Sequence, residues 1–471
     1  MHRCFQLPGG EIVERICFHL DRQGDLTALA RASKVFSSHA LRVIWESVSL
    51  VNLLRCLPSD AYSTEMGHGI WIMVLGGVGS LELLGTLQDG DFDRIRLYAP
   101  YIQHLFCDMK IPFTEADRDG VYFLDHFLTP QITSIRIPAY RGHGGATTFM
   151  LLVKLPICCP QLQDLTCVTR YPSSDAAATS VVSSCVARLN SLRTLNMDLL
   201  DQAALAHLSR LSSLQHLRLK AFPSDFPAAE DGAYFQFLQT LHFHSDIHSV
   251  SQFLERGRRI PLVEFKCESS TSAMADEVDR LFSAVSGAIS HPTLEQFSLD
   301  NGYISDELTD LIRSSSIRSL FCFVNLTFLS ILSTTGIDWD DATVTDMARS
   351  WPRIKSLELL AFRGTAAPRA TLRSLEAFAQ YCPDLTALGI AFDAISVPTL
   401  SASNFSLPAL TWLDVEASPV SEPHAVAMFL EAILPRLETL QTLVDGAGSE
   451  ETLQLEYDEV WKEVDAIRKG S

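Results

Sequence analysis

Several marks of membrane, secreted and disulfide-bonded proteins are missing from this sequence. The longest apolar run, residues 70–78, contains Gly76 and Gly77 and is far shorter than the roughly 20 residues that cross a bilayer. Charges at Arg3, Glu11 and Glu14 interrupt the beginning, so no signal peptide is expected. The eleven cysteines are an odd number and include no Cys-x-x-Cys, so no disulfide framework is expected. We expect a reduced, intracellular protein of the cytoplasm or nucleus, with no membrane partner.

Basic residues are scarce as well, and common catalytic motifs are absent. Lys and Arg number 37 against 56 Asp and Glu, a net charge of −19 that disfavours binding to nucleic-acid phosphates. There is no Gly-x-Ser-x-Gly, no His-Glu-x-x-His and no Gly-x-Gly-x-x-Gly. His242 and His244 would share a strand face, but zinc requires three or four ligands and no others can be assigned. We therefore expect no enzyme activity, no cofactor and no metal, and a zinc enzyme using these histidines remains a third hypothesis.

What the sequence does contain is a repeated frame, seen clearly in Leu214-Gln-His-Leu217-Arg-Leu219. Side chains alternate faces along a strand, so Leu217 and Leu219 would be buried while His216 and Arg218 point outward. The frames recur at a mean step of about 28 residues, which is typical of leucine-rich repeats. The longest step, from Ile317 to Ile354, indicates an insertion. The frames begin at Ile102, Ile132, Leu162, Leu192, Leu214, Leu238, Leu262, Leu294, Ile317, Ile354, Leu385, Leu410 and, degraded, Leu437.

Helical patterns lie between the expected strands, over 276–289, 372–381 and 424–434. The predicted fold is therefore α/β, an irregular leucine-rich-repeat solenoid with a parallel sheet on its concave face and helices outside. Cys167, Cys267 and Cys322 would fall on inward strand positions as small core residues.

Residues 7–45 follow a different pattern, that of three short helices. Ile12, Ile16 and Leu20 are spaced four apart, as on one face of a helix. Asp25 is expected to cap the second helix and Ser37 or Ser38 the third. A core this small is only marginally stable alone. The three helices would therefore need to pack against a partner or the next segment.

This N-terminal stretch resembles the F-box of fungal, basidiomycete-type F-box proteins with C-terminal leucine-rich repeats. Ser33 stands where the family often has cysteine, and residues 45–58 and 91–102 resemble the continuation found in fungal members. The residues that carry the resemblance are Leu7, Pro8, Glu11, Ile12, Ile16, Leu20, Asp25, Leu26, Leu29, Phe36, Ala40, Leu41 and Trp45.

The resemblance implies a domain order and a set of adaptor contacts. Residues 1–58 would be the F-box, 59–101 a connecting segment, 102–444 the repeats and 445–471 an acidic C-terminal cap or tail. The F-box would bind the S-phase-kinase-associated adaptor, which links to a cullin scaffold and a RING subunit. The implied contact residues are Leu7, Pro8, Ile12, Ile16, Leu20, Leu26, Leu29, Phe36 and Trp45.

Outward positions of successive strands predict the target-binding surface. Neighbouring parallel strands lie about 4.8 Å apart, so outward residues of the Leu214, Leu238 and Leu262 repeats would form one basic patch. Such a patch suits an acidic or phosphorylated target. A solvated face without a hot spot is the alternative. The residues singled out are His216, Arg218, Lys220, His242, His244, Lys266, Phe321 and Phe323.

Two functions follow from these patterns. In the first, the chain is the substrate-receptor subunit of an SCF-type cullin–RING ubiquitin ligase, and the repeats bind the target. In the second, it is a leucine-rich-repeat interaction scaffold with no ubiquitin-ligase role, and the N-terminal helices only cap the first repeat. The solvent exposure of Leu7, Pro8, Ile12 and Leu29 discriminates between them.

Overall fold

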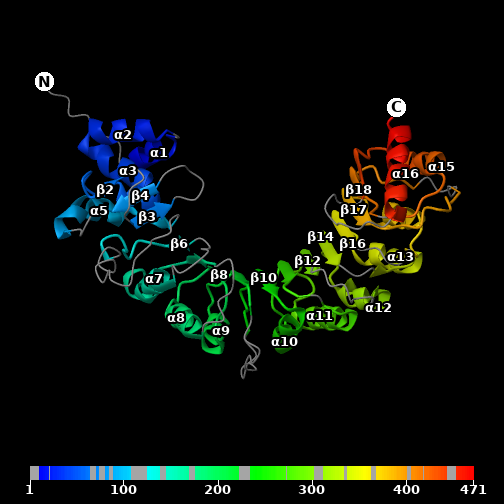
Figure 1. Cartoon of the computed structure of the whole chain (residues 1–471), viewed down its shortest axis with the longest axis horizontal. Helices are drawn as coiled ribbons and strands as arrows, with labels where there is room; N and C mark the ends of the chain where they lie inside the picture. The colour runs from blue at the N-terminus through cyan, green and yellow to red at the C-terminus, as the bar shows by residue number, and fades with distance from the viewer. Residues whose placement is uncertain are drawn as a thin grey trace. The chain divides into compact units, whose positions relative to one another are not determined.

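Repeated strand–helix units make up most of the chain, which divides into two units, Met1–Leu214 and Gln215–Ser471 (Figure 1). Each unit is described by itself. The computed structural model describes residues 10–20, 22–63, 70–73, 80–83, 88–107, 125–137, 145–168, 176–221, 234–271, 273–301, 311–333, 337–361, 368–399, 405–416, 418–442 and 452–470.

Unit 1 contains a parallel sheet whose strands pair in chain order. Each strand is short and alternates buried with partly exposed residues, as in β7, where Leu165 and Cys167 face the core. The strands are β1 (Ser47–Ser49), β5 (His104–Phe106), β6 (Ser134–Ile137), β7 (Asp164–Cys167) and β8 (Thr194–Met197). A separate antiparallel sheet consists of β2 (Tyr62–Ser63), β4 (Ser80–Leu83) and β3 (Ile70–Met73).

Helices of unit 1 fall into an N-terminal group and a repeat group. The N-terminal group is α1 (Gly10–Phe18), α2 (Gln23–Ala32) and α3 (Lys34–Trp45). The repeat group is α4 (Leu50–Leu54), η1 (Asp89–Phe92), α5 (Asp93–Tyr98), η2 (Ala99–Tyr101), α7 (Gly145–Cys158), α8 (Ala176–Val186) and α9 (Gln202–Leu208).

The N-caps expected for the N-terminal helices were wrong. Helix α2 begins before Asp25, which therefore lies inside its first turn. Helix α3 is capped by Ser33, whose hydroxyl oxygen accepts a hydrogen bond from the Val35 N–H at 3.3 Å. A serine just before a helical run satisfies one of the free N–H groups of the first turn.

Unit 2 contains the longer run of parallel strands, and again strand order follows chain order. Its strands are β9 (His216–Leu219), β10 (Thr240–Ser245), β11 (Glu264–Ser269), β12 (Gln296–Asn301), β14 (Phe328–Ser333), β16 (Ser356–Ala361), β17 (Ala387–Ile390), β18 (Trp412–Asp414) and β19 (Thr439–Gln441). A small parallel pair joins β13 (Ile312–Arg313) to β15 (Ile337–Asp338).

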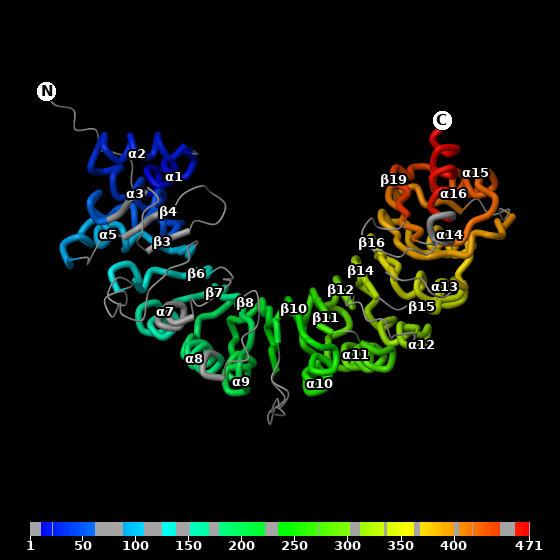
Figure 2. The backbone as a smooth tube through the Cα atoms, viewed as in Figure 1, coloured from blue at the N-terminus to red at the C-terminus, as the bar shows by residue number. Residues whose placement is uncertain are grey.

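Helices of unit 2 cover one face of this sheet and leave the other open (Figure 2). The predicted helices over 276–289, 372–381 and 424–434 are confirmed to within two residues at each end. The helices are α10 (Ile247–Arg256), α11 (Ala275–Ala288), α12 (Ser314–Ile317), η3 (Arg318–Cys322), α13 (Asp341–Ser350), α14 (Ser374–Tyr381), α15 (Pro423–Ile433) and α16 (Thr452–Arg468).

Register stacks the inward residues of neighbouring repeats into continuous rows. Phe243, Phe265 and Phe297 come from three successive strands, and the ring centroids are 6.2 and 5.6 Å apart. Phe282 of α11 meets Phe297 edge to face at 5.8 Å. Burying an aromatic ring contributes roughly 1.5–3 kcal/mol, so each repeat is stabilised mainly by its two neighbours.

The frame predicted to start at Ile317 was wrong. Ile317 and Leu320 are buried, but they lie on α12 and η3. The strand of this repeat is β14, whose frame runs from Leu326 through Leu329 to Ile331. Apolar residues three apart fit a helical turn as well as a turn that leads into a strand, so the frame alone was ambiguous. Cys322, on η3, is accordingly half-buried and not an inward strand residue.

Removing Trp461 should destabilise the C-terminal end of unit 2. This α16 residue is fully buried, and its indole N–H donates to the Ser418 carbonyl oxygen at 2.8 Å. Trp461→Ala would leave a cavity and an unpaired carbonyl, for an expected loss of about 3–5 kcal/mol in unfolding free energy. Urea unfolding measures this loss, and amide hydrogen exchange in β17–β19 locates it. Glu459→Ala, at an exposed α16 position, should change stability by less than about 0.5 kcal/mol.

Candidate functional site

The three N-terminal helices have a small core of their own. Val13 and Cys17 of α1 are buried against Leu26 of α2 and Ala40 of α3. Partly buried side chains complete this core, namely Leu20, Leu29, Ala30, Phe36, Val43 and Ile44. The inward face of α1 is thus the one carrying Val13 and Cys17, with Leu20 joining it at the end of the helix.

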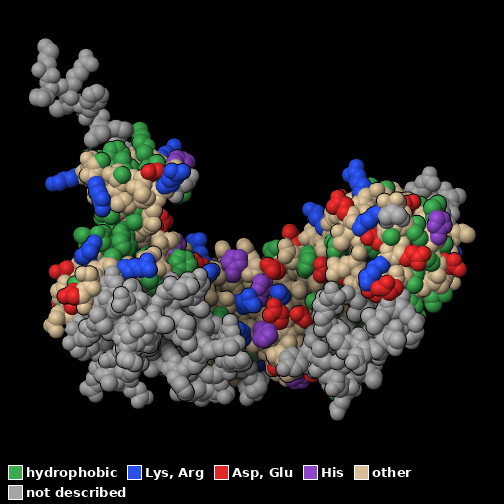
Figure 3. Space-filling view, turned by 45° about the horizontal axis from the view of Figure 1, so that its top comes forward, with side chains coloured by type: hydrophobic (Ala, Val, Ile, Leu, Met, Phe, Trp, Pro, Cys, Tyr) green, Lys and Arg blue, Asp and Glu red, His purple; other side chains and the backbone are tan. Residues whose placement is uncertain are grey.

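Two isoleucines therefore lie on the outside of α1. The side chains of Ile12 and Ile16 are 51% and 44% exposed, and residues four apart lie on the same side of a helix. Phe18 and Val35 are also exposed apolar residues of this group. Figure 3 shows hydrophobic side chains at the surface of these helices. An apolar helix face that the described residues leave uncovered is typical of a protein-binding surface.

Other predicted adaptor contacts are less accessible. Leu26 is buried in the small core, so its prediction as a direct contact was wrong: it supports the helices from inside. Leu29 and Phe36 are half-buried and pack on that core. Trp45 stacks on Tyr98, with ring centroids 4.3 Å apart and planes at 8°, which ties α3 to the following segment. Leu7 and Pro8 lie outside the described residues.

The second surface is the open face of the unit 2 sheet. Backbone pairing confirms the predicted neighbours: His216 pairs with Thr240, Arg218 with His242, and His242 with Lys266. His244 pairs with Glu268 in the next row. Lys220 follows β9 in a bend. We call the outward residues of β9–β11 the open-face cluster, namely His216, Arg218, Thr240, His242, His244, Glu264, Lys266 and Glu268.

Glutamates neutralise the bases of this cluster. Glu268 lies 2.8 Å from the Lys266 Nζ, 3.3 Å from the His244 Nδ1 and 3.9 Å from an Arg218 guanidinium nitrogen. Glu264 lies 2.9 Å from the His242 Nε2. Burial raises the pKa of Glu268, but the Lys266 hydrogen bond and the Arg218 charge outweigh it and lower the pKa. The cluster is therefore mixed in charge rather than simply basic, because Glu264 and Glu268 lie among its bases and pair with them.

The two phenylalanines predicted on this face are elsewhere. Phe323 is fully buried and meets His291 edge to face, at 5.4 Å between ring centroids. Phe321 lies on η3 and packs edge to face on Trp351 at 5.4 Å. Both errors follow from the misassigned frame at Ile317, which shifted the predicted outward positions onto a helical segment.

The far end of the open face is acidic, and the depth of its burial was not foreseen. Asp414 of β18 is only 3% exposed, and its carboxylate accepts a hydrogen bond from the Glu416 N–H at 2.8 Å. Burial raises the pKa of Asp414 to about 6, and the nearby Glu358 carboxylate acts in the same direction. Glu416 accepts from the Ala361 N–H, and burial raises its pKa well above the ordinary value. The backbone of Glu416 is left-handed, with φ at 47°.

His242 and His244 are paired with Glu264 and Glu268, and no group of three His, Cys, Asp or Glu in the described part could hold a metal ion. Free thiols occur at Cys17, Cys56, Cys158, Cys159, Cys167, Cys185, Cys267, Cys322 and Cys382. No described helix has both the length and the apolar character needed to cross a membrane.

Comparisons with known proteins assign no family. No protein-family model matches this chain, and a search of curated proteins found no match. Among solved structures, the chain is similar to one from the crystal structure of the Rad7 and Elc1 complex in yeast. The identity is 13% and the TM-score 0.39, over 94% of this chain and 91% of that chain.

Asp414→Asn should stabilise the protein at neutral pH. Because the pKa of Asp414 is raised on folding, the folded state binds its proton more tightly. The stabilisation that protonated Asp414 contributes to the folded state is fully present below about pH 4 and is lost as pH rises through about 6. The asparagine side chain does not ionise and so avoids that loss. The unfolding free energy should therefore rise by up to about 3 kcal/mol at pH 7.5 and hardly change at pH 4.

Urea unfolding at the two pH values checks this prediction. Asp384→Asn, at an exposed position, is the matched control and should change stability by less than about 0.5 kcal/mol at both. An equal effect of Asp414→Asn at pH 4 and 7.5 would contradict the assigned ionisation.

Proposed function

We propose that this protein is the substrate-receptor subunit of an SCF-type cullin–RING ubiquitin ligase. The observation that carries the proposal is the exposed pair Ile12 and Ile16, on a helix whose opposite side already forms a core with its neighbours. An apolar side chain in water gains roughly 1.5–3 kcal/mol on burial, so this face favours a partner. The resemblance of residues 7–45 to the F-box suggests that the partner is the S-phase-kinase-associated adaptor.

In this proposal the chain itself makes and breaks no covalent bond, and acts in the cytoplasm or nucleus. The N-terminal helices bind the adaptor, and through it the cullin scaffold. The open face of unit 2 binds the target protein. Holding both at once raises the effective concentration of the target near the ubiquitin-charged enzyme, which accelerates transfer.

The open face suits a polar target of mixed charge. Arg218 and Lys266 each lie near Glu268, and such partly exposed ion pairs contribute only about 0–1 kcal/mol. A target carboxylate or phosphate could therefore replace Glu268 as the partner of either base at small cost. Specificity would then come from the geometry of the row rather than from net charge.

A specific observation favours the alternative, an interaction scaffold outside the ubiquitin system. Trp45 stacks on Tyr98, and the N–H groups of Gln103 and His104 donate to the Glu46 carbonyl oxygen. Helix α3 is thus fastened to the first repeat of unit 1, as a cap would be. The scaffold leaves the exposed Ile12 and Ile16 without a role, so we place it second.

Adaptor binding should depend on the outer face of α1. Ile12→Asp with Ile16→Asp puts two charges where the proposal places an apolar contact, so binding should weaken at least about 100-fold in a pull-down or by calorimetry. The matched control is Val153→Asp with Ile157→Asp, a second exposed pair four apart, on α7. Unchanged adaptor binding by the α1 variant, with folding intact by thermal unfolding, would leave the scaffold as the better interpretation.

Target binding should depend on the open face instead. Arg218→Gln with Lys266→Gln removes the two permanent positive charges of the open-face cluster, so a target that pairs with them should be lost while the adaptor is retained. Quantitative mass spectrometry of co-purified proteins measures both. The α1 variant should show the reverse pattern. If the same variant lost target and adaptor together, the two surfaces would not be separate.

A further inference from the structure

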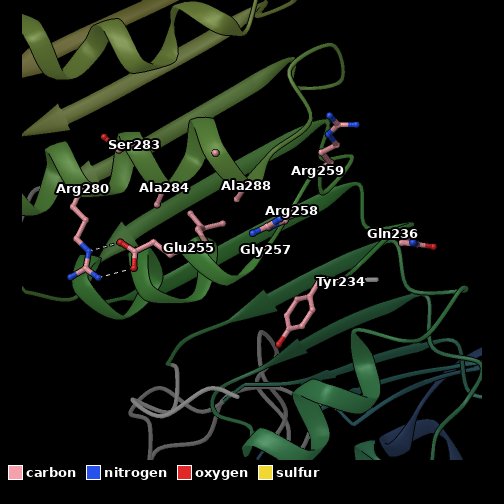
Figure 4. A pocket seen from close by; sticks show the side chains of 12 residues that line it. Tyr234, Gln236, Glu255, Gly257, Arg258, Arg259, Arg280, Ser283, Ala284 and Ala288 are labelled. Carbon is pink, nitrogen blue, oxygen red and sulfur yellow. Dashed lines mark hydrogen bonds and ion pairs between the residues drawn. The ribbon is translucent and has the colours of Figure 1, made fainter. Parts of the chain in front are cut away.

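A cleft of about 810 Å³ opens among the helices of unit 2, apart from the open face of the sheet. The C-terminal end of α10 and the turn after it form one wall, α11 forms the floor, and Tyr234 closes another side (Figure 4). This volume is within the roughly 300–1,000 Å³ of typical ligand sites, and is much larger than a single small ion requires.

The cleft is basic although the chain is strongly acidic. Its charged lining residues are Arg258, Arg259, Arg280 and Glu255, which sum to a charge of +2, against −19 for the chain. Both arginines of the 257–260 turn are exposed and make no ion pair with any described residue. They leave the turn in different directions, as Figure 4 shows. The charges of Arg258 and Arg259 are therefore not neutralised by any described residue.

The other two charged lining residues, Arg280 and Glu255, form a salt bridge in the wall of the cleft. Arg280 of α11 donates from its Nε and one terminal nitrogen to the two carboxylate oxygens of Glu255, at 2.6 and 2.7 Å. Its guanidinium holds the pKa of Glu255 below the ordinary value, so the carboxylate stays ionised and the bridge persists. This two-point bridge joins α10 to α11 at the end of the cleft opposite Arg259 (Figure 4).

Backbone geometry also distinguishes the turn. Arg259 has φ at 55°, in the left-handed region that side-chain-bearing residues seldom adopt. On α11, Gly287 lines the cleft, and a Cβ built there would meet no atom within 4 Å. A glycine weakens a helix, yet here it keeps the floor of the cleft open.

We propose that this cleft binds a phosphorylated segment of a partner protein. Guanidinium groups pair with phosphate oxygens through two parallel hydrogen bonds, and Arg258 and Arg259 have no competing carboxylate among the described residues. The volume accommodates several residues of a peptide around the phosphate. The site lies on helices, whereas the proposed target surface lies on strands, so both can be occupied together. The proposal does not depend on the ligase role.

Binding of a phosphopeptide to the full-length protein tests this proposal. The probe is a fluorescein-labelled peptide of alternating glycine and phosphoserine, with its unphosphorylated serine counterpart, measured by anisotropy at several salt concentrations. Arg258→Gln with Arg259→Gly removes both charges and relieves the left-handed strain at position 259. Affinity for the phosphorylated probe should fall at least about tenfold, with a shallower salt dependence, because two charge-assisted hydrogen-bond donors are lost.

A plug variant separates the cleft from exposed charge alone. Gly287→Leu fills the floor without touching a charge and favours the helix, so the thermal unfolding midpoint should stay or rise while probe binding falls at least about tenfold. The charge-matched control is Arg373→Gln with Arg436→Gln, two exposed arginines of unit 2 outside the cleft, and should bind as the wild type does.

Five results would overturn the proposal. The first four are no binding of the phosphorylated probe by the wild type, equal binding of the serine peptide, an equal loss in the control variant, and normal binding by Gly287→Leu. A loss confined to Arg218→Gln with Lys266→Gln would also overturn it, because that result would move the phosphopeptide to the open face. Adaptor binding should be unchanged in every cleft variant, so failure here and failure of the ligase proposal are distinguishable.

Discussion

In-register pairing of parallel, half-buried strands is the constraint from which the rest of this structure follows. A strand such as β10 buries Leu241 and Phe243 on one side and exposes His242 on the other. It has no stable position until β9 and β11 pair with it and α10 covers its apolar side. The residues at each level of the frame are therefore forced into rows, inside as the phenylalanine stack and outside as the open-face cluster.

The same constraint explains why the open face is nearly neutral. Rows bring side chains of successive repeats together, and a row of bases alone would repel itself across neighbouring strands. Glu264 and Glu268 occupy the strand next to the histidines and separate the charges. Groups left uncompensated, with no packing partner or opposite charge among the described residues, occur outside the paired strands. Among the described residues they include the apolar side chains of Ile12 and Ile16 on α1, and the arginines of the turn after α10.

These uncompensated groups differ in chemistry, which suggests different partners. The α1 surface offers apolar area and favours a protein with a complementary groove. The cleft beside α11 offers guanidinium groups and favours phosphate. Every proposed role is one of binding and positioning, and a repeat fold suits such roles because surfaces can be added along it without disturbing a shared core. Burying acidic side chains on such a surface costs free energy, as at Asp414 and Glu416, where burial raises the pKa of both carboxyls.

The sequence by itself determined the parallel α/β repeat architecture, because period-two alternation and helical spacing are local properties. It predicted most strands from Ile102 onward and the neighbours of Arg218 and His242. The F-box assignment of the N-terminal helices stays a prediction. Only the tertiary structure decided between patterns that look alike in one dimension. Ile12 with Ile16 and Val13 with Cys17 have the same spacing, but packing against α2 and α3 buried only the second pair. Likewise Ile317 and Leu320 fit a helical turn as well as a strand frame, and long-range pairing gave the strand to Leu329. The cleft could not be predicted at all, because its walls come from three separate segments, within 234–236, 254–259 and 280–288, and its emptiness depends on where Gly287 falls on a packed helix.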